Sequence, residues 1–164
     1  MLACLDVDYR PDLTVAACVL FRAWTDATES SHLVEHGPPA EPYEPGQFYR
    51  RELPHLLRVL ARVEVPLEAI IVDGYVWLGE DKPGLGAHLY EALNREVPVI
   101  GVAKTAYVTT GPSVTVLRGQ SLRPLFVGAA GMDVKVAAEH IRRMHGPSRS
   151  PTLLKRVDHL CRTS

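Results

Sequence analysis

Three acidic residues stand at positions where the hydrophobic pattern of the chain predicts burial. Asp6 lies in the middle of an apolar run, and Asp73 closes another one directly before a glycine. Glu52 precedes Leu56 by one helical turn, so its side chain is expected to point toward the core. Carboxylates are rarely buried unless they are paired or bind a metal ion. These three residues are therefore candidates for a shared site.

Such a site would suit hydrolysis of a phosphate ester. Carboxylate oxygens are the ligands that Mg²⁺ and Mn²⁺ prefer, and a metal held by them polarises the phosphate, activates water and stabilises the leaving oxygen. Asp73 ends an expected strand, and α/β sheets bind ligands at the carboxyl ends of parallel strands. Lys104 follows the next strand and could neutralise phosphate charge there. The candidate catalytic residues are Asp6, Glu52, Asp73 and Lys104, and the three acids are also the candidate metal ligands.

Each of these residues also has an ordinary structural interpretation. Asp6 could pair with a buried arginine, Asp73 could begin an Asp-Gly turn, and Glu52 could be a first-turn acid stabilised by the helix dipole. Lys104 could be an exposed lysine after a strand. The periodicity alone does not require the three acids to converge.

The strands expected to carry these residues begin with an antiparallel hairpin. Residues 2–9 and 13–24 have strand character, and the Pro-Asp sequence between them fits a turn. A third strand is expected over 31–36. A buried strand at 69–72, a helix over 84–95 and a strand over 97–103 then predict a parallel unit with a right-handed crossover.

Helices are expected to cover this sheet. One is expected to begin near Glu52 and to end near Val63, with residues 47–51 as an extended lead-in, because Pro54 is tolerated in the first turn of a helix. The antiparallel start and the parallel unit together predict an α/β fold with a mixed sheet. Two or three short strands within 106–127 and helices over 134–144 and 152–161 complete the expected elements.

The composition indicates an ordinary globular chain. It has 164 residues, 46% of them hydrophobic and 23% charged, which predicts one domain over 1–164 and excludes disordered, collagen-like and coiled-coil classes. The apolar run 13–24 is too short to span a membrane, and residues 1–6 lack the basic start of a signal peptide. The three cysteines form no metal or disulfide pattern, so a cytoplasmic location is expected.

The charge is unevenly distributed along the chain. Residues 1–100 hold 8 basic and 16 acidic residues, a net charge of −8, whereas residues 101–164 hold 10 and 3, a net charge of +7. A basic final third could bind nucleic acid. It could equally be a solvated helix face that balances the acidic part.

Five blocks of the sequence resemble the endonuclease V family, in that family's order and over nearly the whole chain. Leu5-Asp6-Val7-Asp8-Tyr9 resembles the block of the first strand, and Pro42-Tyr43-Glu44-Pro45-Gly46 through Arg51-Glu52 is similar to the family's Pro-Tyr-x-Pro-Gly and Arg-Glu motif. Val72-Asp73-Gly74 through Gly84-Leu85-Gly86-Ala87-His88-Leu89 resembles the second Asp block. Ile100-Gly101-Val102-Ala103-Lys104 and the closing set Arg149, Pro151, Lys155 and Asp158 complete the match.

The resemblance implies an RNase H-like fold with helices on both faces of a mixed sheet. It implies Mg²⁺-dependent cleavage of DNA or RNA near a deaminated base, chiefly hypoxanthine, in nucleic-acid repair. By resemblance, Asp6, Glu52 and Asp73 would hold the metal, and Lys104 would neutralise phosphate charge. Tyr43 would fill the gap left by a flipped base, although a turn tyrosine that covers a core edge would look the same. Nucleic-acid contacts are implied for Tyr43, Pro45, Gly46, Arg51, Gly74, Gly84 and His88.

The chain departs from the family pattern in two places. Val76 stands where the family usually has glycine, and two acids, Glu80 and Asp81, replace a His-Pro-Arg-like stretch. The usual closing histidine is absent from residues 127–133, where Asp133 could act as a ligand or begin a helix. These departures leave a non-cleaving nucleic-acid-binding relative as the alternative, and a domain that binds a protein partner as a third interpretation.

Overall fold

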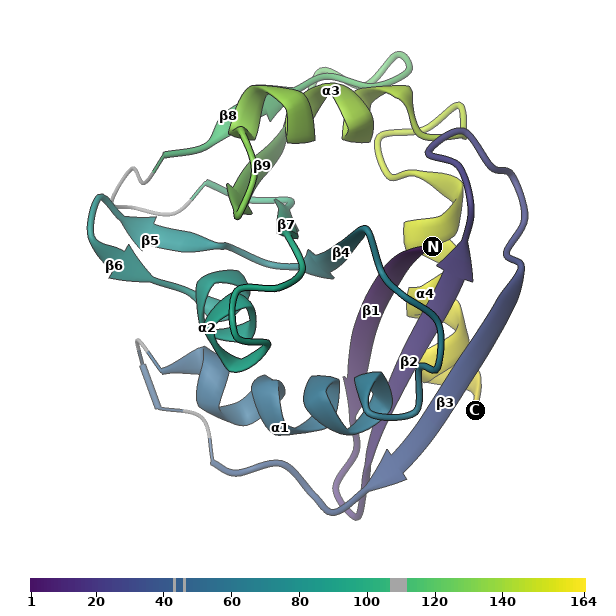
Figure 1. Ribbon diagram of the computed structural model, residues 1–164, viewed down its shortest axis with the longest axis vertical. Coiled ribbons are helices and arrows are strands. Elements are labelled where there is room, and N and C mark those ends of the chain that lie inside the picture. The colour runs from purple at the N-terminus through teal and green to yellow at the C-terminus, as the bar shows by residue number, and fades with distance from the viewer. Residues whose placement is uncertain (43, 46, 107–111) are drawn as a thin grey trace.

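The computed structural model describes residues 1–42, 44–45, 47–106 and 112–164. Among these residues, seven strands form one mixed sheet in the order β3-β2-β1-β4-β7-β9-β8, and two short strands pair separately (Figure 1). The strands are β1 (Leu2–Tyr9), β2 (Thr14–Phe21), β3 (Ser31–Gly37), β4 (Ala69–Asp73), β5 (Trp77–Gly79), β6 (Lys82–Pro83), β7 (Val99–Ala103), β8 (Val114–Val116) and β9 (Leu125–Ala130). The helices are α1 (Phe48–Leu60), α2 (Leu85–Ala92), α3 (Val134–Arg143) and α4 (Thr152–Thr163).

The strand directions confirm the predicted mixed sheet. β2 is antiparallel to both of its neighbours, β1 and β3, and the turn between β1 and β2 is closed by the Arg10 amide, which donates to the Leu13 carbonyl at 2.9 Å. β1, β4 and β7 run parallel, so the expected parallel unit is confirmed. The carboxyl ends of three neighbouring strands therefore meet at one edge of the sheet.

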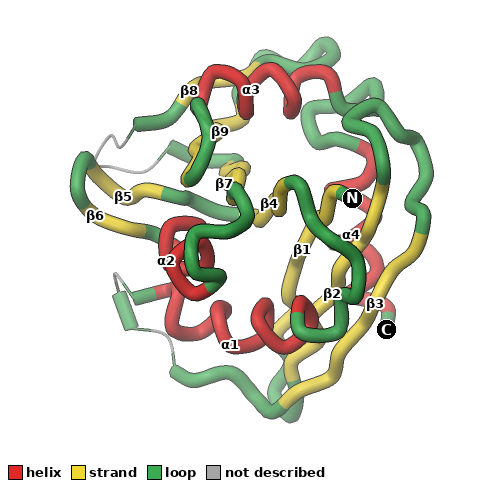
Figure 2. Tube along the Cα trace, in the orientation of Figure 1, coloured by secondary structure: helices red, strands yellow, loops and turns green. Residues whose placement is uncertain are grey.

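Helices cover both faces of this sheet, as the resemblance implied (Figure 2). Alternate side chains of each strand point to opposite faces, so two core clusters form. Cys4 and Ile71 pack with residues of α3 and α4, whereas Leu5 and Val72 pack with residues of α1 and α2. None of the helices that the structure describes is long and apolar enough to cross a membrane.

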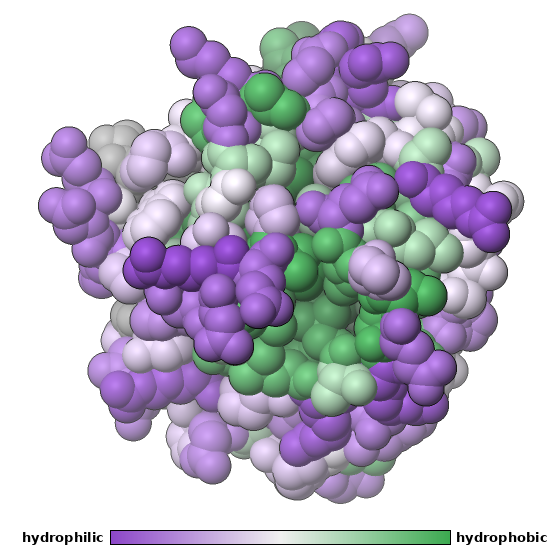
Figure 3. All heavy atoms as spheres, in the orientation of Figure 1, coloured by the Kyte–Doolittle hydropathy of each residue, from purple (hydrophilic) through white to green (hydrophobic). Residues whose placement is uncertain are grey.

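The second core cluster reaches the surface. Figure 3 shows a hollow hydrophobic area in the middle of one face, which in Figure 1 lies between α1, α2 and the segment that leads into β4. The cluster has half-buried members in each of these parts: Leu57 in α1, Leu67 before β4 and Leu93 after α2. The face covered by α1 and α2 therefore shows hydrophobic side chains at its centre, with polar residues around them.

One predicted boundary was wrong, and one pair of strands was missed. α1 begins at Phe48 and not near Glu52, so the expected extended lead-in is helical and Pro54 lies inside the helix. The Tyr49 ring stacks on His88 of α2, with ring centroids 3.5 Å apart, and this contact stabilises a turn that Pro54 alone would disfavour. The hairpin of β5 and β6 was not predicted. Its position depends on a tertiary contact, because the Trp77 indole donates to the Ala129 carbonyl at 3.1 Å.

Candidate acidic site at the carboxyl ends of the central strands

Asp6 and Asp73 lie side by side on neighbouring parallel strands. The register pairs Leu5 of β1 with Val72 of β4, so the aspartates occupy the next positions. Asp6 alternates with Cys4, whose side chain faces α4, and both aspartates line a cavity of about 60 Å³ against that helix. The two aspartates therefore lie next to each other where β1 and β4 stop pairing, a placement that the sequence pattern had left open.

Glu52 approaches the same place from α1. Its side chain is 4% exposed, on the buried stripe that also carries Leu56 and Val59. Burial and the nearby carboxylates of Asp6 and Asp73 raise the pKa of Glu52 to about 8, while the Tyr9 hydroxyl beside it acts in the opposite direction. The three acids that the hydrophobic pattern singled out thus converge.

A fourth acid, Asp158 of α4, completes the site. Its side chain hydrogen-bonds to that of Asp6, and one ligand atom from each of Asp6, Asp158 and Cys161 lies within 4.8 Å of the others. Burial raises the pKa of the Cys161 thiol to about 12, so this sulfur stays protonated and does not resemble a ligand for a hard cation. We refer to Asp6, Glu52, Asp73 and Asp158 as the acidic site.

Ionisation is disfavoured for the aspartates of the acidic site that lie on β1 and β4. Burial and the charge of Asp73 raise the pKa of Asp6 to about 7, and the hydrogen bond to Asp158 acts in the same direction. Burial also raises the pKa of Asp73, whereas the Lys104 ammonium opposes that shift. Several carboxylates in a small volume disfavour one another's ionised form unless a cation neutralises them.

Two lysines border the cavity. Lys104 follows β7 and is exposed, and Lys155 lies on the first turns of α4. The Arg149 guanidinium donates to the Lys104 carbonyl and, at 2.8 Å, to the Pro124 carbonyl, so the strand end that carries Lys104 is attached to the segment before α4. Carboxylates on one wall and ammonium groups on the rim form an arrangement that can hold a divalent cation beside a phosphate.

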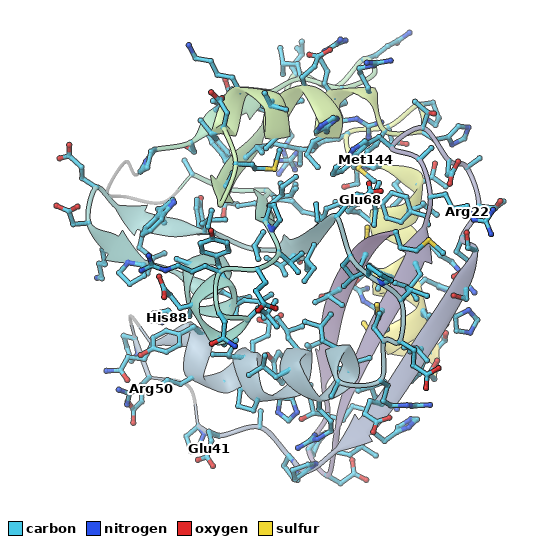
Figure 4. The ribbon with its side chains drawn as sticks, in the orientation of Figure 1. Arg22, Glu41, Arg50, Glu68, His88 and Met144 are labelled. Carbon is cyan, nitrogen blue, oxygen red and sulfur yellow. The ribbon has the colours of Figure 1, made fainter. Side chains whose placement is uncertain are left out.

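The remaining predicted residues that the structure describes lie in different environments. The Arg51 guanidinium lies over the Tyr9 ring, 4.3 Å from its centroid. His88 stacks on Tyr49, and Figure 4 shows His88 and Arg50 near the same end of α1. Pro45 is exposed. Tyr43 and Gly46, the predicted wedge and its neighbour, lie outside the described residues.

Two predicted glycines are required by the backbone. Gly74 has φ +135°, a conformation that favours glycine, and its amide donates to the Val102 carbonyl at 3.0 Å. Gly84 caps the N-terminal end of α2, and a Cβ there would lie 2.8 Å from the Tyr75 carbonyl oxygen. Both glycines therefore keep the segment after Asp73 close to the sheet.

Val76, the residue that departs from the family pattern, is buried. It is 1% exposed and packs with Ala87 and Ala130. A Cβ on Gly86 or on Gly101 would lie 2.6 Å or 2.9 Å from its Cγ2 atom, so the valine side chain fills a space lined by glycines.

Two other acids named from the sequence, Asp133 and Asp8, have partners of their own. Asp133 begins α3, where its carboxylate accepts from the Lys135 amide at 2.7 Å, as the helix-start interpretation predicted. Asp8 pairs with Arg10 at 3.0 Å, and Arg10 also donates to the Cys161 carbonyl near the end of α4.

Asp158 as a member of the acidic site was missed by the sequence analysis. A signal was present, because Asp158 follows Leu154 by four residues and precedes Cys161 by three, which places it on the half-buried side of the predicted helix. That pattern did not indicate which strand the helix would cover. The packing of α4 against β1 and β2 decides this.

Comparisons with known proteins show the family and the fold of this chain. A family model described as Endonuclease V matches residues 1–126. A Streptomyces avermitilis protein named Endonuclease V is 29% identical to this chain, and the match covers 94% of this chain and 75% of that protein. A crystal structure of Endonuclease V from the same organism has a TM-score of 0.80 and 27% identity, and the match covers 98% of this chain and 79% of that one. Endonuclease V of Ciona intestinalis, solved with a 23mer DNA containing an inosine, has a TM-score of 0.79 at 17% identity and covers 98% of this chain and 83% of that one.

Proposed function

The chain belongs to the endonuclease V family, and from this premise we propose that it is a metal-dependent endonuclease that hydrolyses a phosphodiester near a deaminated base, hypoxanthine, in DNA or RNA. The observation that carries the proposal is the convergence of four carboxylates from four elements beside Lys104. A role in nucleic-acid repair follows from this activity.

The donor set fits a hard divalent cation. All four side chains of the acidic site offer oxygen ligands. Burial, together with neighbouring carboxylates, raises the pKa values of Asp6, Glu52 and Asp73, and a bound cation would favour their ionised forms. Asp6, Glu52, Asp73 and Asp158 would hold Mg²⁺ or Mn²⁺, with Asp158 added to the three ligands expected from the sequence. When bound, the metal would polarise the phosphate, lower the pKa of water and stabilise the leaving oxygen.

The protein's own groups would bind and orient the strand. Lys104 and Lys155 on the rim would attract the phosphates, and the positive charge of Lys104 would oppose the negative charge that develops on the reacting phosphate. Tyr43, Pro45, Gly46, Arg51, Gly74, Gly84 and His88 remain the proposed nucleic-acid contacts. Because Val76 fills a glycine-lined space near Gly74, base preference is the part of the proposal that most needs a direct test.

A cleavage assay tests the proposal. The substrates are single- and double-stranded DNA and RNA, each with and without one inosine, in Mg²⁺, in Mn²⁺ and in chelator. We expect metal-dependent cleavage near inosine by the wild type, loss of cleavage in Asp73→Asn, and full activity in Asp12→Asn, which changes an exposed turn acid. Cleavage by Asp73→Asn at the wild-type rate would contradict the assignment of the acidic site.

The alternative function is binding without cleavage, and the altered residues Val76, Glu80 and Asp81 are the observation that favours it. It predicts that the wild type binds the same strands, with affinity falling steeply as salt rises, and yields no product in any metal. Cleavage without preference for inosine would instead support the nuclease with a changed base specificity.

A further inference from the structure

A buried arginine lies on the side of the molecule opposite α1. Arg118 follows β8 and is 5% exposed, and none of the ion pairs recorded among the described residues includes it. Its guanidinium donates instead to main-chain carbonyls of the segment between α3 and α4. The acceptors are Met144 at 2.5 Å, Ser148 at 3.0 Å, Gly146 at 3.2 Å and Arg149 at 3.4 Å.

The end of α3 explains why a buried cation is tolerated here. Met144 is the residue that caps the C-terminal end of α3, where unsatisfied carbonyls carry partial negative charge. The fixed fork of a guanidinium can reach several carbonyls at once, which a lysine ammonium cannot do with the same geometry. Arg118 therefore offsets the partial negative charge at the end of α3 and provides hydrogen bonds to the carbonyls of the connecting segment.

The neighbouring glycine brings the two segments into close contact. Gly119 has φ +60°, and a Cβ there would lie 2.2 Å from the Pro147 carbonyl oxygen. The segment 144–149 thus lies directly on the turn 118–119. Figure 1 shows this connection between the end of α3 and the start of α4.

This segment determines where α4 begins. The His145 carbonyl accepts from the Thr152 amide at 2.8 Å, and the His145 ring contacts the Thr152 hydroxyl at 2.9 Å. The Lys155 ammonium donates to the Ser148 hydroxyl at 2.9 Å. Two residues of the first turns of α4 are therefore attached to the loop that Arg118 holds.

The same segment also contacts the other side of the acidic site. Arg149, whose carbonyl accepts from Arg118, donates to the carbonyls of Lys104 and Pro124. A continuous set of hydrogen bonds consequently leads from Arg118 to the strand end with Lys104 and to the helix with Asp158.

We propose that Arg118 is a positioning residue for the acidic site: by holding the segment 144–149, it sets the position of α4 and thereby brings Asp158 to Asp6 and Lys155 to the cavity. The activity part of this proposal rests on the proposed function. The structural part does not, because it concerns the placement of one helix and its carboxylate.

The test compares Arg118→Met, Arg118→Lys and the matched control Arg123→Met. Arg123 is an exposed arginine on the same connection between β8 and β9. Three measurements are made on each folded protein: amide hydrogen exchange in peptides spanning 145–158, Mn²⁺ affinity by titration, and the cleavage rate at one fixed Mn²⁺ concentration below saturation.

For Arg118→Met we expect exchange at least tenfold faster over 145–158, with β1 and β2 unchanged. Outer residues that orient metal ligands typically alter metal affinity about 10- to 100-fold when removed, so we expect Mn²⁺ affinity to fall by that factor and cleavage to fall in parallel. Arg118→Lys should lie between Arg118→Met and the wild type, because it keeps the charge but loses the fork. Arg123→Met should match the wild type.

Unchanged exchange over 145–158 and unchanged Mn²⁺ affinity in a folded Arg118→Met would overturn the proposal. So would faster exchange spread evenly over the whole chain, since it would mean that Arg118 supports overall stability and not the position of α4. If the wild type binds Mn²⁺ but cleaves nothing, the nuclease proposal fails, while the exchange and affinity measurements still decide the role of Arg118.

Discussion

Replacement of Glu52 by glutamine should stabilise the metal-free protein, and increasingly so as the pH rises. Glu52 is buried beside Asp6 and Asp73, and its pKa is about 8 in the folded protein against 4.5 for the ordinary side chain. An acid whose pKa is raised by folding binds its proton more tightly in the folded state. Stability is therefore unaffected below about pH 4.5 and is lost as the pH rises toward 8.

The magnitude follows from that difference in pKa. Each pH unit between the two values costs about 1.4 kcal/mol of unfolding free energy. Between pH 5 and pH 8 the wild type should thus lose about 3 to 4 kcal/mol relative to Glu52→Gln, which has no charge to bury at that position. The difference is large against a typical total stability of about 5–15 kcal/mol.

Urea denaturation in chelator at pH 5, 6, 7 and 8 measures this difference directly. The control is Glu64→Gln, which removes an exposed carboxylate. Addition of Mg²⁺ should then stabilise the wild type more than Glu52→Gln, because a ligand that binds the folded state raises its stability. Parallel stability curves for the wild type and Glu52→Gln across this pH range would refute the reasoning that Glu52 is held in a repulsive carboxylate cluster.

Three further substitutions separate the parts of the site. Asp158→Asn should abolish cleavage and weaken Mn²⁺ binding at least tenfold, whereas Asp133→Asn, which keeps a helix-capping oxygen, should do neither; metal titration of both variants checks this. Lys104→Met should lower the cleavage rate about 10- to 1,000-fold with Mn²⁺ affinity retained, and an equal loss of metal affinity would speak against a role on phosphate. Gly101→Ala should destabilise the fold by about 1–3 kcal/mol and weaken metal binding, because its Cβ would lie 2.5 Å from the Gly74 carbonyl oxygen; thermal unfolding that matches the wild type would contradict this.

Local pattern was sufficient to predict most of the elements and three of the four acids. Strands alternate or run apolar, helices repeat at their own spacing, and a carboxylate inside such a pattern is conspicuous because its burial costs free energy. Asp6, Glu52 and Asp73 were recognisable for that reason, but local pattern did not require them to meet. Their meeting depends on β4 pairing with β1 and on α1 packing over these strands.

Tertiary contacts decided the rest. α1 begins before Pro54 because Tyr49 packs on His88, a residue of another helix that local propensity does not include. Asp158 belongs to the acidic site because α4 packs against β1, and the position of that helix depends on carbonyls held by Arg118, distant in the sequence. Sequence periodicity determines which side of an element is buried, whereas long-range packing determines which partner buries it. Here the packing of α4 on β1 added Asp158 to the acidic site.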